Sequence, residues 1–163
     1  MQKALRQKVY NYLRPISISS VLIGPDRNAI SMRNYQHATI LLNVGTVASA
    51  GNTFTIQQCK NVEGGGAKAL AFDRYYYSTG NASPAEDSDQ WQEVVSGTLL
   101  TIAATSYMVE VDARMLDVDN RFDCIRPSLD SVASANLVSI VVILSNPRYT
   151  GRLKANQPSA MVN

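Results

Sequence analysis

The stretch that decides the fold is ATILLNV, residues Ala38–Val44 of a 163-residue chain. Apolar residues recur at every second position, and side chains of a β-strand alternate between its two faces with the same period. The pattern predicts a half-buried strand whose core side carries Ala38, Ile40, Leu42 and Val44. The residues expected on the opposite side are Thr39, Leu41 and Asn43.

Two other stretches extend this reading along the chain. Tyr107–Asp112 alternates in the same way and is expected to be half-buried. Leu137–Leu144 is apolar at almost every position, which is typical of a strand covered on both faces. We therefore expect Leu137–Leu144 to lie centrally in a sheet, with its outer face covered by another element or by another subunit.

Short strand-like runs fill most of the chain from residue 16 onward. Clusters of Gly, Pro, Asn and Asp separate them, and the longest such loop is Asn81–Asp89. The expected strands are Ile16–Ile23, Ala29–Met32, Ala38–Val44, Thr53–Cys59, Ala67–Phe72, Tyr75–Ser78, Trp91–Val95, Thr98–Ile102, Tyr107–Asp112, Arg121–Ile125 and Leu137–Leu144. So many short strands predict a single all-β domain, a jelly-roll-like β-sandwich over residues 16–146.

The two ends of the chain differ from this body in pattern and in charge. Residues 1–15 are expected to form an arm or a short amphipathic helix that Pro15 ends, and residues 147–163 an irregular tail. The apolar residues near one face of this helix are Leu5, Val9, Tyr12 and Leu13. Seven of the 15 basic residues lie in the two ends without one acid, which leaves eight against all 13 acidic residues in the body. The sequence thus predicts a mildly acidic body with two basic arms.

These basic arms are the predicted partner-binding site, although they could equally be tails that only add solubility. Segregated basic charge suits an acidic surface. A protein partner is favoured over nucleic acid, because a DNA-binding domain normally adds a recognition element or a basic face. We expect the apolar side chains of the arms to fill a groove of the partner and the basic ones to meet carboxylates. The predicted residues are Lys3, Leu5, Arg6, Lys8, Val9, Leu13, Arg14, Arg148, Arg152 and Lys154.

The sequence predicts no enzyme, and no cofactor or metal. His37 is the only histidine, which excludes most His-based triads and multi-His metal sites. Asp117–Asp123 resembles the start of a calcium loop, but such a loop would need Asp or Asn in place of Arg121, Gly in place of Phe122 and Glu in place of Ser128. Gly64–Lys68 lacks the Gly-Lys-Ser/Thr order of a phosphate loop and is expected to be a hairpin tip.

Aromatic and sulfur-containing residues give further expectations. Tyr75–Tyr77 is expected to turn one ring inward and two toward solvent or a partner, with stacking on bases or sugars as the alternative. Cys59 and Cys124 are expected to be buried, reduced thiols, because they lie in strand-like runs without metal-binding spacing. No apolar run is long enough to cross a bilayer. We therefore expect no membrane contact and synthesis in a reducing cytosol.

Three segments carry a pattern that extends beyond strand spacing, namely Asn34–Thr46, Thr53–Gln58 and Trp91–Val94. The pattern resembles small structural proteins of tailed bacteriophages, above all capsid decoration, or cement, proteins. In that group a β-sandwich or jelly roll begins with Asn-Tyr, an apolar strand and Asn-Val-Gly, and continues into a strand with glutamines. The likeness covers about the middle two-thirds of the chain.

The resemblance implies a virion structural protein that binds the outside of the capsid and stabilises the head by bridging major capsid subunits. It implies the major capsid protein as partner, a homo-oligomer (dimer or trimer), and a place on the virion exterior after synthesis in the host cytoplasm. One alternative is a head-to-tail connector or tail component. Another, from a different class, is a carbohydrate-binding β-sandwich that uses Trp91 and the tyrosines.

Overall fold

A computed structural model of the chain describes residues 7–18, 28–45, 53–78, 91–95, 97, 99–102, 105–129 and 136–148. These residues form strands and two short 3-10 turns but no α-helix, so the predicted all-β class is confirmed. The strands are β1 (Lys8–Ile18), β2 (Ile30–Ser31), β3 (Tyr35–Val44), β4 (Thr53–Cys59), β5 (Lys68–Leu70), β6 (Arg74–Ser78), β7 (Trp91–Val95), β8 (Leu99–Thr101), β9 (Ser106–Asp112), β10 (Cys124–Leu129) and β11 (Asn136–Pro147). The turns are η1 (Ala113–Met115) and η2 (Val118–Asn120).

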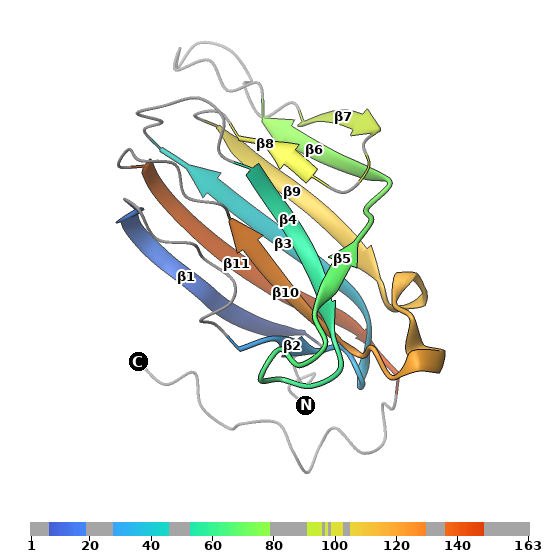
Figure 1. The fold of residues 1–163 in the computed structure, drawn as a ribbon. Helices are drawn as coiled ribbons and strands as arrows, with labels where there is room; N and C mark the ends of the chain where they lie inside the picture. Colours follow the sequence, from blue (N-terminus) through green and yellow to red (C-terminus); the bar gives the residue numbers. More distant parts are fainter. Residues whose placement is uncertain are drawn as a thin grey trace, which may run out of the picture.

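Two antiparallel sheets pack face to face around one main core (Figure 1). The six-stranded sheet has the order β1-β11-β3-β9-β6-β7, and the five-stranded sheet has the order β2-β10-β4-β5 with β8 paired to β4. The chain changes sheet after β1, β2, β3, β5, β7, β8, β9 and β10, and the first strand lies beside the last. This is the double Greek-key order of a jelly roll. The predicted jelly-roll-like sandwich is therefore confirmed, with the β6–β7 hairpin added at one edge.

Alternate residues of each strand build the core. On β3, Ala38, Ile40 and Leu42 are completely buried between the sheets, whereas Thr39 and Leu41 on the other side are half-buried. The alternation predicted for this strand is thus correct. Each fully buried aliphatic side chain of this kind stabilises the fold by about 1.5–3 kcal/mol relative to its exposed state.

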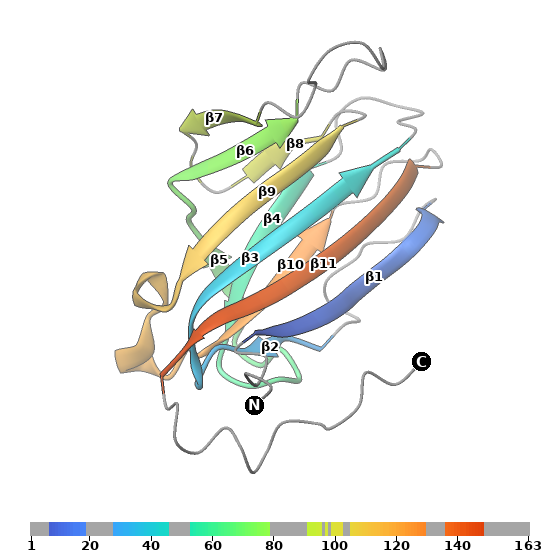
Figure 2. The same cartoon turned by 180° about the vertical axis from the view of Figure 1, so that it is seen from behind.

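The apolar strand β11 lies between β1 and β3, so its predicted internal position is also correct. Its inward residues Val138, Ile140 and Val142 are buried, and its outward residues Val141 and Ile143 are half-buried. No described element lies over the outer side of this sheet, as the view from behind shows (Figure 2). The outer cover that the sequence predicts is therefore not supplied by the described part of this chain.

The predicted N-terminal helix is wrong over residues 8–14, because these residues lie in β1, an edge strand paired antiparallel to β11. Helical spacing would place Val9 and Leu13 on one face. A register shift between Asn11 and Leu13, typical of a β-bulge, puts them on opposite sides instead. Val9 is 57% exposed, while Leu13 is 1% exposed in the core. Pairing with β11 thus outweighs the local helical pattern, and Pro15 is tolerated because β1 is an edge strand.

Two further boundaries differ from the expected ones. The predicted domain boundary at residue 15 falls inside β1, and residues 19–23 of the first expected strand lie outside the described residues. The expected strand at 121–125 begins later, at Cys124, because Arg121 adopts a left-handed conformation (φ 68°) that ends η2. Pro127 fits within β10 because β2 pairs only with Cys124 and Ile125, which leaves one side of β10 without a described strand at Pro127.

Candidate functional site: an uncovered sheet face and a basic groove

The outer side of the six-stranded sheet carries a continuous line of side chains across all six strands. Strand register places one residue of each strand in this line, which we call the outer row. In sheet order its members are Asn11, Val141, Leu41, Met108, Tyr76 and Glu93. Directly opposed residues of antiparallel strands have Cβ atoms about 4.5–5.5 Å apart, so these neighbours are in contact range. The four central members are apolar or aromatic.

More apolar side chains flank the outer row. Val9 and Ile143 oppose each other across β1 and β11. Large apolar residues exposed on this side or at its edge include Val9 (57%), Leu137 (46%), Trp91 (42%) and Val95 (82%). The centres of protein interfaces are rich in aromatic residues and Met and poor in Lys, Glu and Asp. The composition of this side therefore matches a protein interface better than a solvated surface.

Charged groups are few on this side of the sheet. His37 Nε2 lies 3.8 Å from Glu110 Oε1, and its Nδ1 lies 3.1 Å from Ser145 Oγ. At the β6–β7 edge, Arg74 Nη1 donates to Glu93 Oε1 at 2.9 Å. Among the side chains that the structure describes on β1, β11, β3 and β9, none that faces outward is a lysine or arginine. No cation therefore interrupts the centre of the apolar surface.

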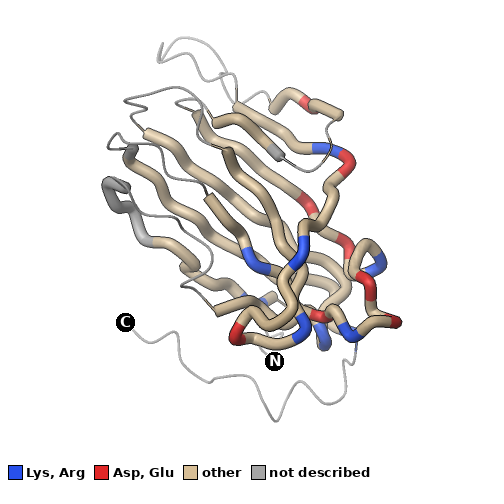
Figure 3. Tube along the Cα trace, in the orientation of Figure 1, with Lys and Arg blue, Asp and Glu red and all other residues tan. Residues whose placement is uncertain are grey.

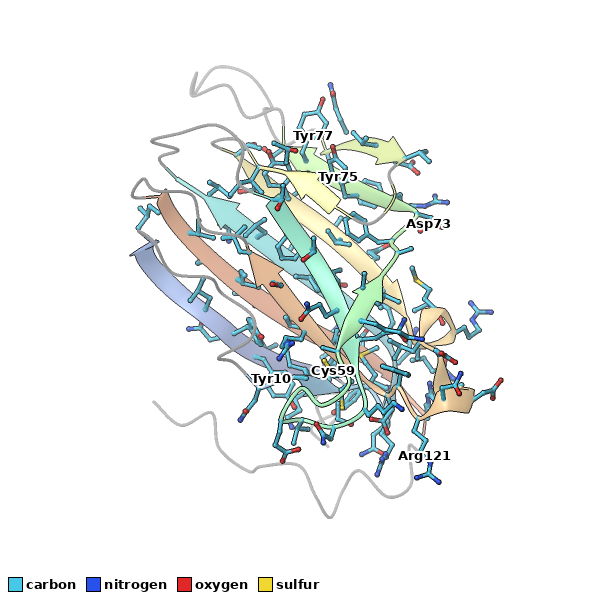
Figure 4. The ribbon with its side chains drawn as sticks, viewed as in Figure 1. Tyr10, Cys59, Asp73, Tyr75, Tyr77 and Arg121 are labelled. Atoms are coloured by element: carbon cyan, nitrogen blue, oxygen red, sulfur yellow. The ribbon has the colours of Figure 1, made fainter. Side chains whose placement is uncertain are left out.

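The tyrosine run on β6 is oriented differently from the prediction. Tyr75 and Tyr77 turn inward and pack against the core, and Tyr75 meets Tyr107 edge to face with ring centroids 6.2 Å apart (Figure 4). Only Tyr76 faces outward, toward Met108 in the outer row. The expected single inward ring is thus wrong, because the apolar core extends beneath β6 through Tyr107. Trp91 lies outward on β7, opposite Ser78.

Charged residues gather at one end of the sandwich, around η1, η2 and the turn between β4 and β5, while the strands are mostly uncharged (Figure 3). A groove of about 370 Å³ lies at this end, and we call it the basic groove. Its lining residues are Met32, Arg33, Lys60, Leu116, Val118, Arg121, Asp123 and Arg148. Four of the eight are cations and only one is an acid.

Ion pairing inside the basic groove is incomplete. Arg33 donates from Nε and Nη2 to Asp123 Oδ2 at 2.8 and 2.7 Å. Lys60 Nζ lies 5.1 Å from the centroid of the Phe122 ring, a cation–π contact. Within the described part of the chain, the side chains of Arg121 and Arg148 make no ion pair and no hydrogen bond. Three positive charges in the groove thus have no carboxylate partner among the residues that the structure describes.

Two of the three acidic residues in the segment that resembles a calcium loop, Asp117 and Asp123, are held by side chains of this protein. Lys68 Nζ pairs with Asp117 Oδ2 at 2.5 Å, and Asn120 Nδ2 donates to both oxygens of Asp117. The hydrogen bond from Lys68 is the main cause of a lowered pKa of Asp117. Asp123 is paired with Arg33. The described residues contain no group of three or more His, Cys, Asp or Glu that could hold a metal ion.

The outer side of the five-stranded sheet is covered over β10, all of whose residues are buried, although Ala69 on β5 is exposed. Arg126 on β10 is only 6% exposed and donates from Nε and Nη2 to Gln57 Oε1 at 2.9 and 2.7 Å. The turn between β4 and β5, which is the predicted hairpin tip, lies close to Arg126. A Cβ atom at Gly64 would stand 2.3 Å from Arg126 Nη1. The turn thus helps to bury the arginine.

The two cysteines lie on this covered side, directly opposite each other on β4 and β10. Both are buried and free, as predicted, and they form a small cluster with Ala29. Burial raises the pKa of Cys59. Burial, together with the bond from its Sγ to Asp123 Oδ1 at 3.1 Å, raises the pKa of Cys124 to about 12. Neither thiol is prepared for nucleophilic chemistry, which needs a lowered pKa.

The structure separates the residues predicted for partner binding. Val9 reaches the outer side of the six-stranded sheet, and Arg148 lines the basic groove just after β11. Lys8 is half-buried, with its Nζ 4.7 Å from the centroid of the Tyr10 ring. The prediction that Leu13 contacts a partner is wrong, because its side chain is buried in the core and cannot anchor an external partner. The remaining predicted positions lie outside the described side chains: Lys3, Leu5, Arg6, Arg14, Arg152 and Lys154.

Sequence reasoning missed the outer row and most of the basic groove. The outward positions of each strand could be read from the alternation, but their alignment depends on register, which no local pattern supplies. Arg33, Lys60 and Arg121 are separated by tens of residues and meet only through the jelly-roll order. The signal available for Arg121 was its place in a polar segment between two apolar runs.

Comparisons with known proteins identify neither a family nor a function for this chain. No protein-family model matches the chain, and no curated protein matches it. Among solved structures, the chain is similar to a subunit of Bacillus endospore appendages, described as disulfide-linked pili. The identity is 14%, the match covers 86% of this chain and 87% of the other, and the TM-score is 0.32. None of the described helices has the length and apolar character needed to span a membrane.

Proposed function

We propose that this protein is a virion structural protein that attaches to the outside of a phage capsid and stabilises it by bridging major capsid subunits. The proposed attachment surface is the outer side of the six-stranded sheet. The observation that carries the proposal is the outer row, in which Val141, Leu41, Met108 and Tyr76 form an uninterrupted apolar line. The sequence resemblance supports a capsid as the partner. The proposed role needs neither catalysis nor a cofactor.

The size of this surface fits such a role. Six strands spaced about 4.8 Å apart, with about 30 Å of strand length, present a face on the order of 700 Å². A standard protein interface covers about 800 Å² on each partner. One contact of this size gives moderate affinity. Several contacts, made by an oligomer on the repeated subunits of a capsid, add through effective concentration to strong attachment.

Charge placed in the outer row tests the proposal. Leu41→Lys and Val141→Lys should each lower the affinity for purified capsids that lack this protein by about tenfold or more, because a central interface residue is lost and a cation is buried. The measurement is co-sedimentation with particles over a range of protein concentrations. Ala69→Lys is the matched control, since Ala69 is an exposed strand residue of the other sheet. Thermal unfolding checks that all three variants fold.

Parent-like binding by both outer-row variants would overturn the proposed attachment surface. If the parent itself fails to bind capsids but forms a ring on isolated necks or tails, the protein is a connector or tail component. Trp91 and Tyr76 face the same side of the β6–β7 hairpin, which keeps a carbohydrate-binding role testable. Glycan-array binding that is lost on Trp91→Ala would identify that role instead.

The basic arms are proposed as a second, weaker contact with the capsid. Because residues 8–14 belong to β1, the informative deletion removes residues 1–6 only and leaves the sandwich intact. A second variant changes Lys3, Arg6, Arg152 and Lys154 to Gln. Exposed ion pairs are worth at most about 1 kcal/mol each and weaken with salt. We expect modest, salt-dependent losses of capsid binding, and unchanged binding at every salt concentration would remove the arms from the mechanism.

A further inference from the structure

We propose that the basic groove binds the acidic segment 79–90 of a second copy of this chain. The inference goes beyond the proposed function, because it concerns the contact between copies and needs no capsid. It rests on the unpaired cations of the groove, on the charge of the segment and on the distance between them within one chain.

The groove is suited to a peptide that carries carboxylates. Asp123 is already engaged by Arg33, so the cations that remain are Lys60, Arg121 and Arg148. The same groove has apolar walls, since Met32 and Leu116 are almost fully buried and Val118 is 51% exposed. A phosphate group alone would use only the cations. A peptide would use both the cations and the apolar wall.

A second hollow beside the groove, lined by Gln36, Asp112 and Arg114 among others, is a poorer candidate. Of its two arginines, Arg148 also lines the basic groove, and Arg114 is already neutralised within the chain. Arg114 donates from Nε to Asp112 Oδ1 at 3.0 Å and from Nη2 to Oδ2 at 3.1 Å. A second carboxylate would gain little there, so the unpaired cations of the basic groove define the site.

Segment 79–90 has the complementary composition. Its sequence is TGNASPAEDSDQ, with three carboxylates at Glu86, Asp87 and Asp89 and no lysine or arginine. Three acidic groups thus match three unpaired cations. The segment joins β6 to β7, and its flanking residues Ser78 and Trp91 are paired to each other across the two strands.

Strand register places the base of this segment at the far end of the sandwich from the groove. Tyr77 is level with Tyr107, and Tyr107 is level with Leu42 on β3. From Leu42 back to Tyr35 is seven residues, or about 23 Å of strand. The groove lies beyond Tyr35, where Arg148 N–H donates to Asn34 O. Figure 4 shows Tyr77 and Arg121 at opposite ends of the molecule.

The segment therefore cannot reach the groove of its own chain. A 12-residue segment tied at both ends to paired residues extends at most about six residues outward, or about 20 Å. A second copy is needed to bring the two together. Because the contact joins two different surfaces, it is heterologous and leads to a ring or an open row of copies.

A peptide titration tests the groove directly. The probe is the synthetic peptide of residues 79–90, and the receptor is the full chain with Glu86→Gln, Asp87→Asn and Asp89→Asn, so that no copy fills the groove of another. The control peptide carries the same three changes. Arg121→Asn and Arg148→Gln, each added to this receptor, should lower the affinity for the acidic peptide by about three- to fivefold. Higher salt should lower this affinity further.

Two of these variants are chosen to separate binding from folding. Arg121 has φ 68°, a conformation that Asn adopts readily, so Arg121→Asn removes the charge without straining the turn. Arg74→Gln is the matched control, because Arg74 is an exposed cation outside the groove and pairs with Glu93. Equal binding of acidic and control peptides would overturn the proposal. The proposal would also be overturned if the receptor bound inorganic polyphosphate but not the acidic peptide.

Self-association of the full chain gives the second test. Arg148→Glu and Asp87→Lys should each reduce association in sedimentation velocity, and mixing the two variants should restore part of it. A parent chain that stays monomeric at high micromolar concentration would overturn the inference. Capsid binding by Arg121→Asn separates the two proposals, because Arg121 belongs to the groove and not to the arms, so a failure of the groove should leave attachment through the outer row of each copy in place.

Discussion

The two sides of the six-stranded sheet resemble each other in sequence but differ in what covers them. Along β11, inward Ile140 and outward Val141 are both aliphatic, yet Ile140 is completely buried and Val141 is only half-buried. The inner side is covered by the five-stranded sheet, and the outer side by no described element (Figure 2). Under the proposed function, apolar character on both sides of this strand indicates two kinds of burial, one reached on folding and the other on assembly.

The largest expected effect separates these two kinds of burial. Ile140→Ala should lower the free energy of unfolding by about 2–5 kcal/mol, because it leaves a cavity in the core. Val141→Ala should change the stability of the isolated chain by less than about 1 kcal/mol and act mainly on assembly. Urea unfolding of the unassembled chain measures both. Equal losses would mean that both sides are buried in one copy.

A second, smaller effect concerns the other sheet, where the chain's own β4–β5 turn helps to bury Arg126 on the outer side. Gly64→Ala should destabilise the chain by about 1–3 kcal/mol, because φ at this position is +84° and the new Cβ would collide with Arg126 Nη1. Gly97→Ala is the control, since its Cβ would meet no atom within 4 Å. Similar melting temperatures for the two variants would show that the turn does not fix Arg126.

The smallest effect is a pH dependence that should come from the charged end and not from the sheet. Hydrogen bonds from Arg114 lower the pKa of Asp112, and a hydrogen bond from Lys68 lowers that of Asp117. A carboxylate whose pKa is lowered in the folded state stabilises the fold at pH values above its unfolded pKa of 3.8. This stabilisation is lost as the pH falls through the folded pKa. Unfolding at pH 6 and pH 3 should show this loss. Asp117→Asn should reduce it, and an unchanged pH dependence would contradict the assignment.

Much of the fold was predictable, because strand period and turn residues are local signals. The alternation in 38–44 fixed which side of β3 is buried, and the apolar run of β11 indicated an internal strand. The helix predicted at the N-terminus failed because the β-bulge between Asn11 and Leu13 changes the period of β1, and pairing with β11 decides its structure. The basic groove could not be predicted from the sequence, since its cations come together only after the sheets have formed.

The position of the two cysteines has a consequence for the oxidation of this protein during storage. Directly opposed residues of antiparallel strands have Cα atoms about 4.5–5.5 Å apart, within the range of about 4.4–6.8 Å that a disulfide spans. Cys59 and Cys124 are opposed in this way, so a bond between them would require little backbone movement. What delays the reaction is the scarcity of thiolate, since burial raises the pKa of both thiols, that of Cys124 to about 12. Storage in air should therefore oxidise the two thiols slowly to a disulfide. Mass spectrometry should show the loss of two hydrogens, while the circular dichroism spectrum stays the same.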